Sequence, residues 1–233
     1  MGQGIFITGT DTGVGKTFFA CALAALLKSS GYKVGVMKPG ETGCIEKDRQ
    51  LFPEDAWRLK DASGCAERIE NICPYRLPEP LAPSIAAERA GVKIDVDHLL
   101  AVYRDISAKH DMTLVEGAGG LMVPLVPSFT FADFARVAKL PLLVVAANKL
   151  GVINHLLLTL EHASCKGLRT IGYVLNQVTA ELSLAAETNR EVLSGLTGVP
   201  CLGEIPFASH ADARHDILKE LDLRTIELLL NKP

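Results

Sequence analysis

The chain has 233 residues, 48% of them hydrophobic and 22% charged, with a formal net charge of -3 at pH 7. A chain of this size and apolar content can bury one sizeable core, so we expect a single domain over residues 1–233. Lysines and arginines are scattered along the sequence, which argues against a nucleic-acid partner.

The longest apolar run, residues 141–148, is far shorter than the ~20 residues needed to cross a bilayer, so we expect no membrane partner. Gly9, Asp11 and Lys16 interrupt the first apolar segment, which favours a buried strand over a secretion signal. The cysteines form no CxxC pair, which favours buried thiols and a cytoplasmic location. The histidines lack metal-ligand spacing.

Short, continuously apolar segments recur along the chain, a pattern typical of strands buried on both faces. They lie at residues 4–9, 33–39, 112–117, 141–148, 170–177 and 200–206. Helical patterns lie between or after them, at residues 16–30, 95–109, 154–166, 181–196 and 212–230. This alternation predicts an α/β fold with a mostly parallel sheet of about seven strands and helices on both faces. Residues 40–83 form the exception, since they are rich in Gly, Pro and charge and show only a short helical pattern near EDAWRLKDA. Long irregular segments often carry function.

The first strand leads into GTDTGVGKT, residues 9–17, and then directly into a helical pattern. A GxxxxGKT phosphate loop would have its first glycine at position 10, where this chain has Thr10. The strand–loop–helix order nevertheless predicts a three-layer P-loop NTPase fold. Backbone N–H groups would surround the phosphates, Lys16 would reach the β and γ groups, and the Thr17 hydroxyl would bind Mg²⁺. Thr12 adds a hydroxyl that an acceptor substrate can meet.

The second strand ends in MKPGETG, which puts Lys38 at the sheet edge where ligands of parallel sheets bind. A strand-end lysine is usually a solvated surface charge. Next to a phosphate loop, a second cation can stabilise the charge of a transferring phosphoryl group, so we expect a catalytic role.

The third apolar strand ends in the acidic residue Glu116, followed by Gly117, Ala118 and Gly119, in a Walker B-like arrangement. Magnesium favours one or two carboxylates together with phosphate oxygens and waters. A second carboxylate can come from the irregular stretch, where the candidates are Glu46, Asp48, Glu54 and Asp55. We favour Asp55, but spacing alone leaves the four open.

The segment NKLG, residues 148–151, is similar to the NKxD element that reads guanine, but Gly151 stands where the aspartate must be. Selectivity for GTP is therefore not supported. Asn176 ends the next strand, and its amide can contact adenine or can serve equally well in a cap or turn.

One enzyme family combines these motifs in this order and spacing: GTDTGVGKT, MKPGETG, EDA, PEPLAPSIAA, VEGAGG, KLGVINH, LNQV and GEIPF. From residue 4 to about residue 208 the chain resembles the dethiobiotin synthetases of biotin biosynthesis. The resemblance implies that CO2 adds to 7,8-diaminopelargonic acid as a carbamate, which ATP phosphorylates before the second amine closes a ureido ring. Mg²⁺ is the implied cofactor and ATP the co-substrate.

The resemblance also implies a role for each matching residue. The implied catalytic residues are Lys38, Lys16 and Thr12, and the metal-binding residues are Thr17, Asp55 and Glu116. The implied substrate contacts are Thr12, Lys38, Thr42, Leu81, Ala82 and Asn154. The implied nucleotide-binding residues are Gly13, Val14, Gly15, Lys16, Thr17, Phe18, Asp55, Glu116, Gly117, Ala118, Gly119, Asn176, Gln177, Pro206, Phe207 and Ala208.

Members of this family are homodimers, and the resemblance implies that Asn154 meets the substrate carboxylate in the partner subunit's site. The residues alone also suggest an N-cap role for Asn154, and both roles can hold together. Gly13, Gly40 and Ser84 depart from residues common in the family, where glutamate, a β-branched residue and histidine occur. A partition-type or regulatory P-loop ATPase and a small-molecule kinase are the alternatives.

Overall fold

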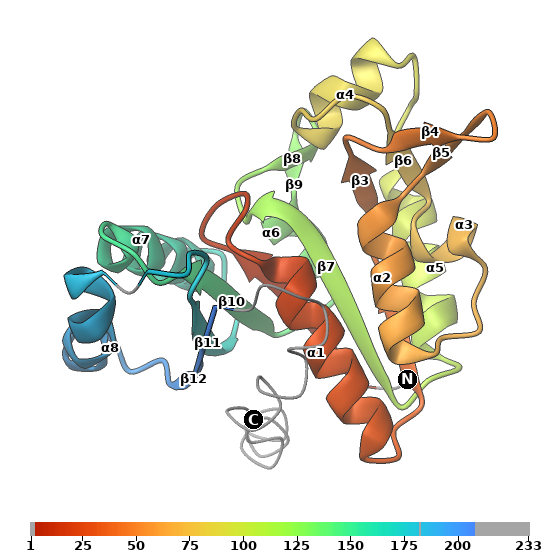
Figure 1. The fold of residues 1–233 in the computed structure, drawn as a ribbon. Coiled ribbons are helices and arrows are strands. Elements are labelled where there is room, and N and C mark those ends of the chain that lie inside the picture. Colours follow the sequence, from red (N-terminus) through yellow and green to blue (C-terminus); the bar gives the residue numbers. More distant parts are fainter. Residues whose placement is uncertain (1–2, 182, 208–233) are drawn as a thin grey trace.

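The computed structural model describes residues 3–181 and 183–207. Its centre is a parallel sheet of six strands in the order β12-β11-β10-β1-β7-β2 (Figure 1). These strands are β1 (Gln3–Gly9), β2 (Val34–Met37), β7 (Met112–Gly120), β10 (Leu142–Ala147), β11 (Thr170–Asn176) and β12 (Cys201–Ile205). Every apolar segment singled out in the sequence is one of these strands. The described residues form six strands in this sheet, where about seven were predicted.

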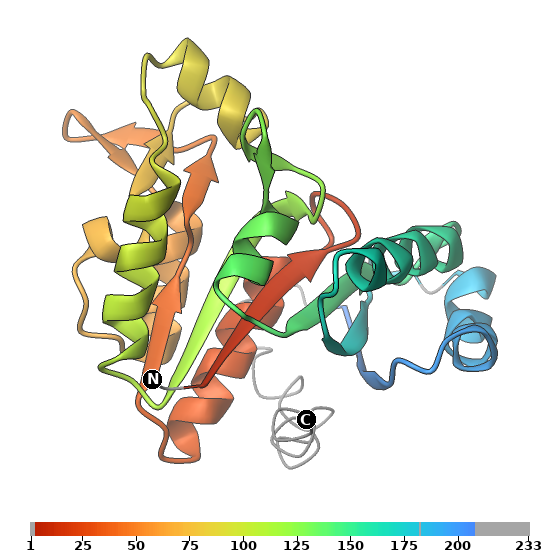
Figure 2. The same ribbon diagram turned by 180° about the vertical axis from the view of Figure 1, so that it is seen from behind.

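Helices cover both faces of the sheet, because successive strand residues point to opposite sides (Figures 1 and 2). Ile5 and Ile7 of β1 pack on one side with α1 (Lys16–Ser29), α2 (Glu54–Ser63) and α3 (Ile69–Ile72). Phe6 points to the other side, where α5 (Val96–Ser107) and α6 (Phe131–Val137) lie. On that side, α7 (Val152–Cys165) and α8 (Leu184–Leu196) cover β10 and β11. The predicted three-layer arrangement is confirmed.

Most predicted helix boundaries agree with the structure. The Asp95 side chain accepts a hydrogen bond from the backbone N–H of His98 and caps α5, as expected from the sequence. Helix α7 begins at Val152, before the predicted start, because Gly151 adopts φ 96° and serves as its N-cap. Asn154 therefore lies inside the first turn, and its predicted N-cap role is wrong. The predicted helix at 212–230 lies outside the described residues.

The stretch at residues 40–83 is not irregular but holds several short elements. Strands β3 (Gly40–Thr42) and β6 (Tyr75–Leu77) pair in parallel, and β4 (Ile45–Lys47) and β5 (Gln50–Phe52) form a hairpin. Helix α4 (Pro83–Arg89) follows β6, and a second hairpin joins β8 (Pro124–Val126) to β9 (Phe129–Thr130). Figure 1 shows β3, α4 and both hairpins gathered at one end of the molecule, beyond the carboxyl ends of β2 and β7. Strands of two or three residues are too short to show a hydrophobic period, so the sequence did not reveal them.

Among the described residues, the structure has no helix that combines the length and the apolar content needed to span a bilayer.

Candidate active site

The carboxyl ends of β1, β7 and β2 bring three sequence motifs together. Ile7 pairs with Glu116, and Met37 pairs with Val115, so Lys38 follows β2 beside Glu116. The phosphate-loop residues 10–15 follow β1 at the same edge. Adjacent parallel strands thus place the two lysine motifs and the acidic motif around one point.

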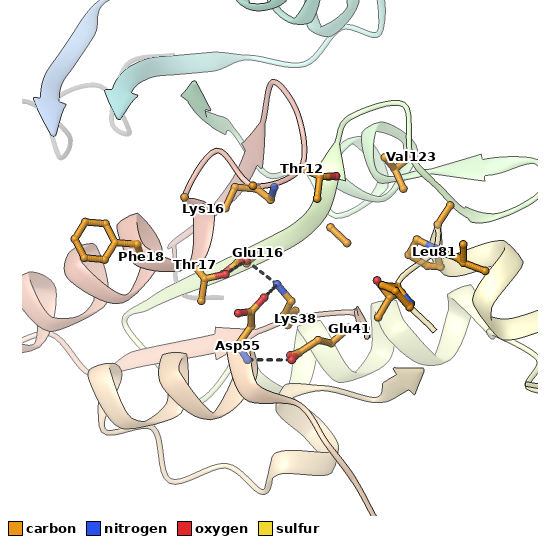
Figure 3. A pocket seen from close by; sticks show the side chains of 18 of the residues that line it. Thr12, Lys16, Thr17, Phe18, Lys38, Glu41, Asp55, Leu81, Glu116 and Val123 are labelled. Carbon is orange, nitrogen blue, oxygen red and sulfur yellow. Dashed lines mark hydrogen bonds and ion pairs between the residues drawn. The ribbon is translucent and has the colours of Figure 1, made fainter. Parts of the chain in front are cut away.

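Four side chains form an ion cluster at this point (Figure 3). The Lys38 ammonium Nζ lies 2.6 Å from Glu116 Oε1 and 2.9 Å from Asp55 Oδ2. The Thr17 hydroxyl donates a hydrogen bond of 2.7 Å to the same Glu116 oxygen. The side chains of Lys38 and Glu116 are only 4% and 1% exposed, so solvent screens their pairing weakly.

The pKa values in the cluster follow from burial opposed by pairing. Burial alone would lower the pKa of Lys38, but the carboxylates of Glu116 and Asp55 outweigh it and raise that pKa. Burial alone would raise the pKa of Asp55, and the Lys38 ammonium reverses this effect, so its pKa lies below the ordinary value. Both groups are therefore charged at neutral pH.

The phosphate loop is shaped by glycines in left-handed backbone conformations, at φ 74° for Gly13 and φ 88° for Gly15. The Lys16 ammonium folds over the loop and donates to the Asp11 carbonyl oxygen at 3.1 Å. Burial lowers the pKa of Lys16 to about 8, although Glu116 acts in the opposite direction. A phosphate group beside this ammonium would favour its charged form.

Asn176, at the end of β11, contacts the phosphate loop through its side chain. Its side-chain Nδ2 donates to the Val14 carbonyl oxygen at 2.9 Å, and a Cβ atom on Gly15 would lie only 2.1 Å from that nitrogen. The Asn176 Oδ1 atom is buried and has no hydrogen-bond partner among the described residues. Asn176 thus has a structural contact to the loop that the sequence did not predict, and the adenine contact stays a prediction.

A pocket of about 800 Å³ opens over the ion cluster. The predicted site residues that line it are Thr12, Gly13, Gly15, Lys16, Thr17, Phe18, Lys38, Thr42, Asp55, Leu81, Ala82, Glu116, Ala118 and Gly119. Leu81 and Val123 lie at one end of the pocket, and Phe18 and Thr17 lie at the other (Figure 3). One cavity therefore joins the phosphate loop to an end with apolar side chains.

Several predicted residues do not line this pocket. Val14 is buried, and a Cβ atom on Gly117 would meet the rings of Phe6 and Phe131. Asn176, Gln177, Pro206 and Phe207 also lie outside its lining, and Ala208 lies outside the described residues.

Asn154 lies on α7 beside a separate depression that Leu157, Leu158, Leu196 and Val199 help to line. Its predicted function needs a partner subunit and stays a prediction.

The structure distinguishes the four acidic candidates of residues 40–83. Glu46 and Asp48 are exposed in the β4–β5 hairpin, and Glu54 pairs with the exposed Arg58. Among the described residues, only Asp55 of these four reaches Lys38. Asp55 also comes near Thr17, since the Thr17 hydroxyl helps to lower its pKa.

Five pocket residues were not among the predicted site residues: Glu41, Arg58, Pro80, Pro83 and Val123. Glu41 is 5% exposed, and its carboxylate accepts backbone N–H bonds from Asp55 and Ala56. Burial raises the pKa of Glu41 to about 6, against the influence of Lys38. Because its partners are backbone groups fourteen or more residues away, no local pattern marks Glu41.

The NKLG segment has a structural explanation. Asn148 is buried, donates to the Ala186 carbonyl oxygen at 3.2 Å and accepts from Asn189 Nδ2 at 2.9 Å. It ties the end of β10 to α8.

The six cysteines are free thiols, and Cys21, Cys44, Cys65 and Cys73 are buried as expected, whereas Cys165 is exposed and Cys201 half-buried.

The donor set of the ion cluster suits a magnesium ion. The Thr17 hydroxyl and the Asp55 and Glu116 carboxylates are hard oxygen donors, and Glu116 Oε2 is buried without a hydrogen-bond partner in the described part of the chain. No cluster of three or more His, Cys, Asp or Glu side chains suited to a metal occurs among the described residues. Magnesium favours one or two carboxylates together with phosphate oxygens and water, and the hydroxyl and two carboxylates of the cluster are compatible with that preference.

Comparison with known proteins gives a matching family model and several curated sequence relatives. A family model described as an AAA domain matches residues 3–215. An ATP-dependent dethiobiotin synthetase of Anaeromyxobacter sp. (strain K) is 42% identical over 88% of this chain and 90% of that protein. The synthetase of Thermodesulfovibrio yellowstonii is 40% identical over 89% of this chain and 90% of its own length. That of Bacillus licheniformis is 38% identical over 99% and 97%.

Solved structures give the fold. The cell division ATPase MinD of Pyrococcus furiosus matches with a TM-score of 0.57 at 19% identity, over 98% of this chain and 100% of that chain. The pNOB8 ParA protein, solved bound to nonspecific DNA, matches with a TM-score of 0.61 at 14% identity, over 98% and 99%. At such identities the likeness concerns the fold alone, and it confirms the P-loop NTPase fold predicted from residues 9–17.

Proposed function

The chain belongs to the ATP-dependent dethiobiotin synthetase family, and we propose that its pocket converts 7,8-diaminopelargonic acid, CO2 and ATP into dethiobiotin, ADP and phosphate. One observation carries this proposal. The Lys38 ammonium stands between two carboxylates in a single cavity that runs from the phosphate loop to Leu81 and Ala82. A nucleotide and an aliphatic acceptor can therefore meet at one cation.

The first chemical step joins an amine to carbon dioxide. An uncharged amine of the substrate attacks the carbon of CO2 and loses a proton to solvent, which leaves a carbamate anion. Thr12 and Thr42 line the pocket and offer hydroxyl groups to the diamine and the carbamate. The chain supplies orientation here, which is the main contribution that a step between two bound reactants needs.

The second step transfers the γ-phosphoryl group. A carbamate oxygen attacks the γ-phosphorus, the bond to the β-phosphate oxygen breaks, and ADP leaves, so that a carbamic-phosphoric anhydride remains. Both reactants are anions, and the ammonium groups of Lys16 and Lys38 reduce their repulsion and the charge that develops during transfer. When bound, Mg²⁺ adds positive charge on the phosphate oxygens, and Thr17, Asp55 and Glu116 would hold it.

The third step closes the ring. The second amine attacks the anhydride carbonyl carbon, phosphate leaves with the bridging oxygen, and the nitrogen loses a proton. No side-chain nucleophile is needed in this sequence of steps. The apolar end of the pocket, around Leu81 and Ala82, accommodates the aliphatic chain and keeps both amines at the reacting carbon.

We assign the rest of the nucleotide to residues 13–18 and 116–119, with Asn176, Gln177, Pro206 and Phe207 around the adenine. The unpartnered Asn176 Oδ1 is one acceptor for the base amino group. We further propose a homodimer in the cytoplasm, in which Asn154 in the first turn of α7 contacts the substrate carboxylate bound by the partner subunit. A helix N-terminus suits a carboxylate because its free N–H groups point outward.

Mass spectrometry of the reaction products tests the proposal. Purified chain with ATP, Mg²⁺, bicarbonate and the diamine should form dethiobiotin, and omission of any one component should abolish it. With bicarbonate carrying ¹⁸O, the released phosphate should gain one labelled oxygen, because a carbamate oxygen becomes the bridge to phosphorus. Product without label in the phosphate would contradict the anhydride, and absence of product would contradict the function itself.

A further inference from the structure

Helix α2 carries Asp55 into the ion cluster but has no side-chain cap of its own. Its N-cap residue is Pro53, which makes no capping hydrogen bond through its side chain. The first backbone N–H groups of a helix have no partner within the helix, and leaving them buried without one is costly. The first turn of α2 therefore needs an acceptor from elsewhere in the chain.

Glu41 of β3 supplies that acceptor. Its Oε1 accepts from the Asp55 N–H at 2.9 Å, and its Oε2 accepts from the Ala56 N–H at 3.0 Å (Figure 3 draws the Asp55 bond). Glu41 is 5% exposed, and a negative charge at a helix N-terminus is favourable. Because both carboxylate oxygens of Glu41 accept a hydrogen bond, they hold the first turn of α2 in one orientation relative to β3.

The same short segment also holds the Asp55 side chain. Lys38 lies three residues before Glu41, and its Nζ lies 2.9 Å from Asp55 Oδ2. Glu41 accepts a hydrogen bond from the backbone N–H of Asp55, while Lys38 pairs with the Asp55 carboxylate. Together the three residues close a ring that joins the end of β2, β3 and the start of α2.

We propose that Glu41 is a positioning residue. It fixes the first turn of α2 so that the Asp55 carboxylate faces Lys38 and the other two proposed metal-binding side chains, those of Thr17 and Glu116. The assignment rests on the proposed function, because that function gives Asp55 its role toward magnesium. Groups that orient metal ligands typically change metal affinity or activity by about 10–100-fold when they are removed.

Variants of Glu41 separate positioning from simple stabilisation of a helix. Glu41→Ala removes both acceptors, and Glu41→Gln keeps one oxygen but turns an NH2 group toward a backbone donor. Asp95→Ala is the matched control, since it removes the side-chain cap of α5, a helix from which no residue lines the pocket. Mn²⁺ binding to the chain saturated with a nonhydrolysable ATP analogue, measured by electron paramagnetic resonance, reports the metal site without turnover.

We expect Mn²⁺ affinity to fall about tenfold or more in Glu41→Ala and by a smaller factor in Glu41→Gln. Nucleotide affinity in EDTA should stay within about twofold, because a position that orients a metal ligand leaves the loop contacts to phosphate intact. Asp95→Ala should lower the melting temperature without changing the Mn²⁺ affinity. In an Asp55→Asn background, Glu41→Ala should have little further effect on Mn²⁺ binding, because it acts through Asp55.

Three results overturn the proposal, and the first two are unchanged Mn²⁺ affinity in both Glu41 variants and full additivity of Glu41→Ala and Asp55→Asn. An equal loss of nucleotide affinity in EDTA would instead show that Glu41 contacts the nucleotide and would also overturn it. The proposed function is judged separately, by dethiobiotin formation in the wild-type chain. The binding cycle decides the role of Glu41 even if that product does not form.

Discussion

Lys38→Ala perturbs the ion cluster at its centre. The substitution removes the ammonium that lies 2.6 Å from Glu116 and 2.9 Å from Asp55, and it leaves the phosphate loop unaltered. We expect turnover to fall by about 10²–10³-fold, the range found when one preorganised charge-stabilising group is deleted. Nucleotide affinity should change only slightly, because the Lys16 ammonium and the loop N–H groups remain.

The same substitution should destabilise the nucleotide-free chain. Glu116 is 1% exposed and would lose its counter-ion, and breaking a buried ion pair from one side costs about 3–5 kcal/mol. The lower end applies, since Thr17 still donates to Glu116 and Asp55 is about one third exposed. For a chain of this size, ~3 kcal/mol corresponds to a loss of roughly 6–12 °C in melting temperature.

Steady-state kinetics, nucleotide titration and thermal melting together check this prediction. Lys109→Ala is the matched control, because Lys109 also pairs with a glutamate, Glu67, at 2.8 Å but is 55% exposed. We expect the control to keep full turnover and nearly the wild-type melting temperature, since exposed pairs contribute little. Full turnover in Lys38→Ala, or a loss explained entirely by weaker nucleotide binding, would refute the catalytic role of Lys38.

Three further predictions concern the phosphate loop. Gly15→Ala should abolish nucleotide binding, because its Cβ atom would lie 2.1 Å from Asn176 Nδ2. The Cβ atom of Gly13→Ala would meet no atom within 4 Å, so this variant should cost only ~1–2 kcal/mol of backbone strain. Thermal shift with nucleotide compares the two variants, and equal nucleotide binding by both would contradict the steric argument. Asn176→Ala removes the donor to Val14 and should weaken nucleotide binding by about tenfold in a calorimetric titration, so unchanged affinity would count against its support of the loop. Burial lowers the pKa of Lys16 to about 8, and bound phosphates would raise that pKa, so nucleotide binding should take up a proton above pH 8 and weaken as pH rises. Calorimetry at pH 9 in two buffers of different ionisation enthalpy measures the proton uptake. Zero uptake would contradict this prediction.

Much of the fold follows from the sequence because its strongest signals are local. The buried strands are continuous apolar runs, and the glycine loop between a strand and a helix has few other uses. The small strands β3 to β6 escaped prediction, because a strand of three residues carries no period and depends on its neighbours for hydrogen bonds.

The proximity of the candidate site residues could be predicted where one motif carries its own chemistry, and it was missed where the partner lies far away in the sequence. Lys16 and Thr17 belong to a recognisable loop, and Lys38 and Glu116 stand at strand ends that parallel pairing brings together. Glu41 could not be found in this way, because it caps a helix that begins thirteen residues later at Glu54. Asn154 failed as an N-cap, since the positive φ of Gly151 already starts α7.

ADP release with and without the diamine tests the central claim most directly, namely that this pocket couples ATP cleavage to carboxylation of the diamine. With ATP, Mg²⁺ and bicarbonate present, we predict one ADP for each dethiobiotin formed and release near background when the diamine is omitted. ADP release at the same rate with and without the diamine would contradict the account and would favour a regulatory ATPase.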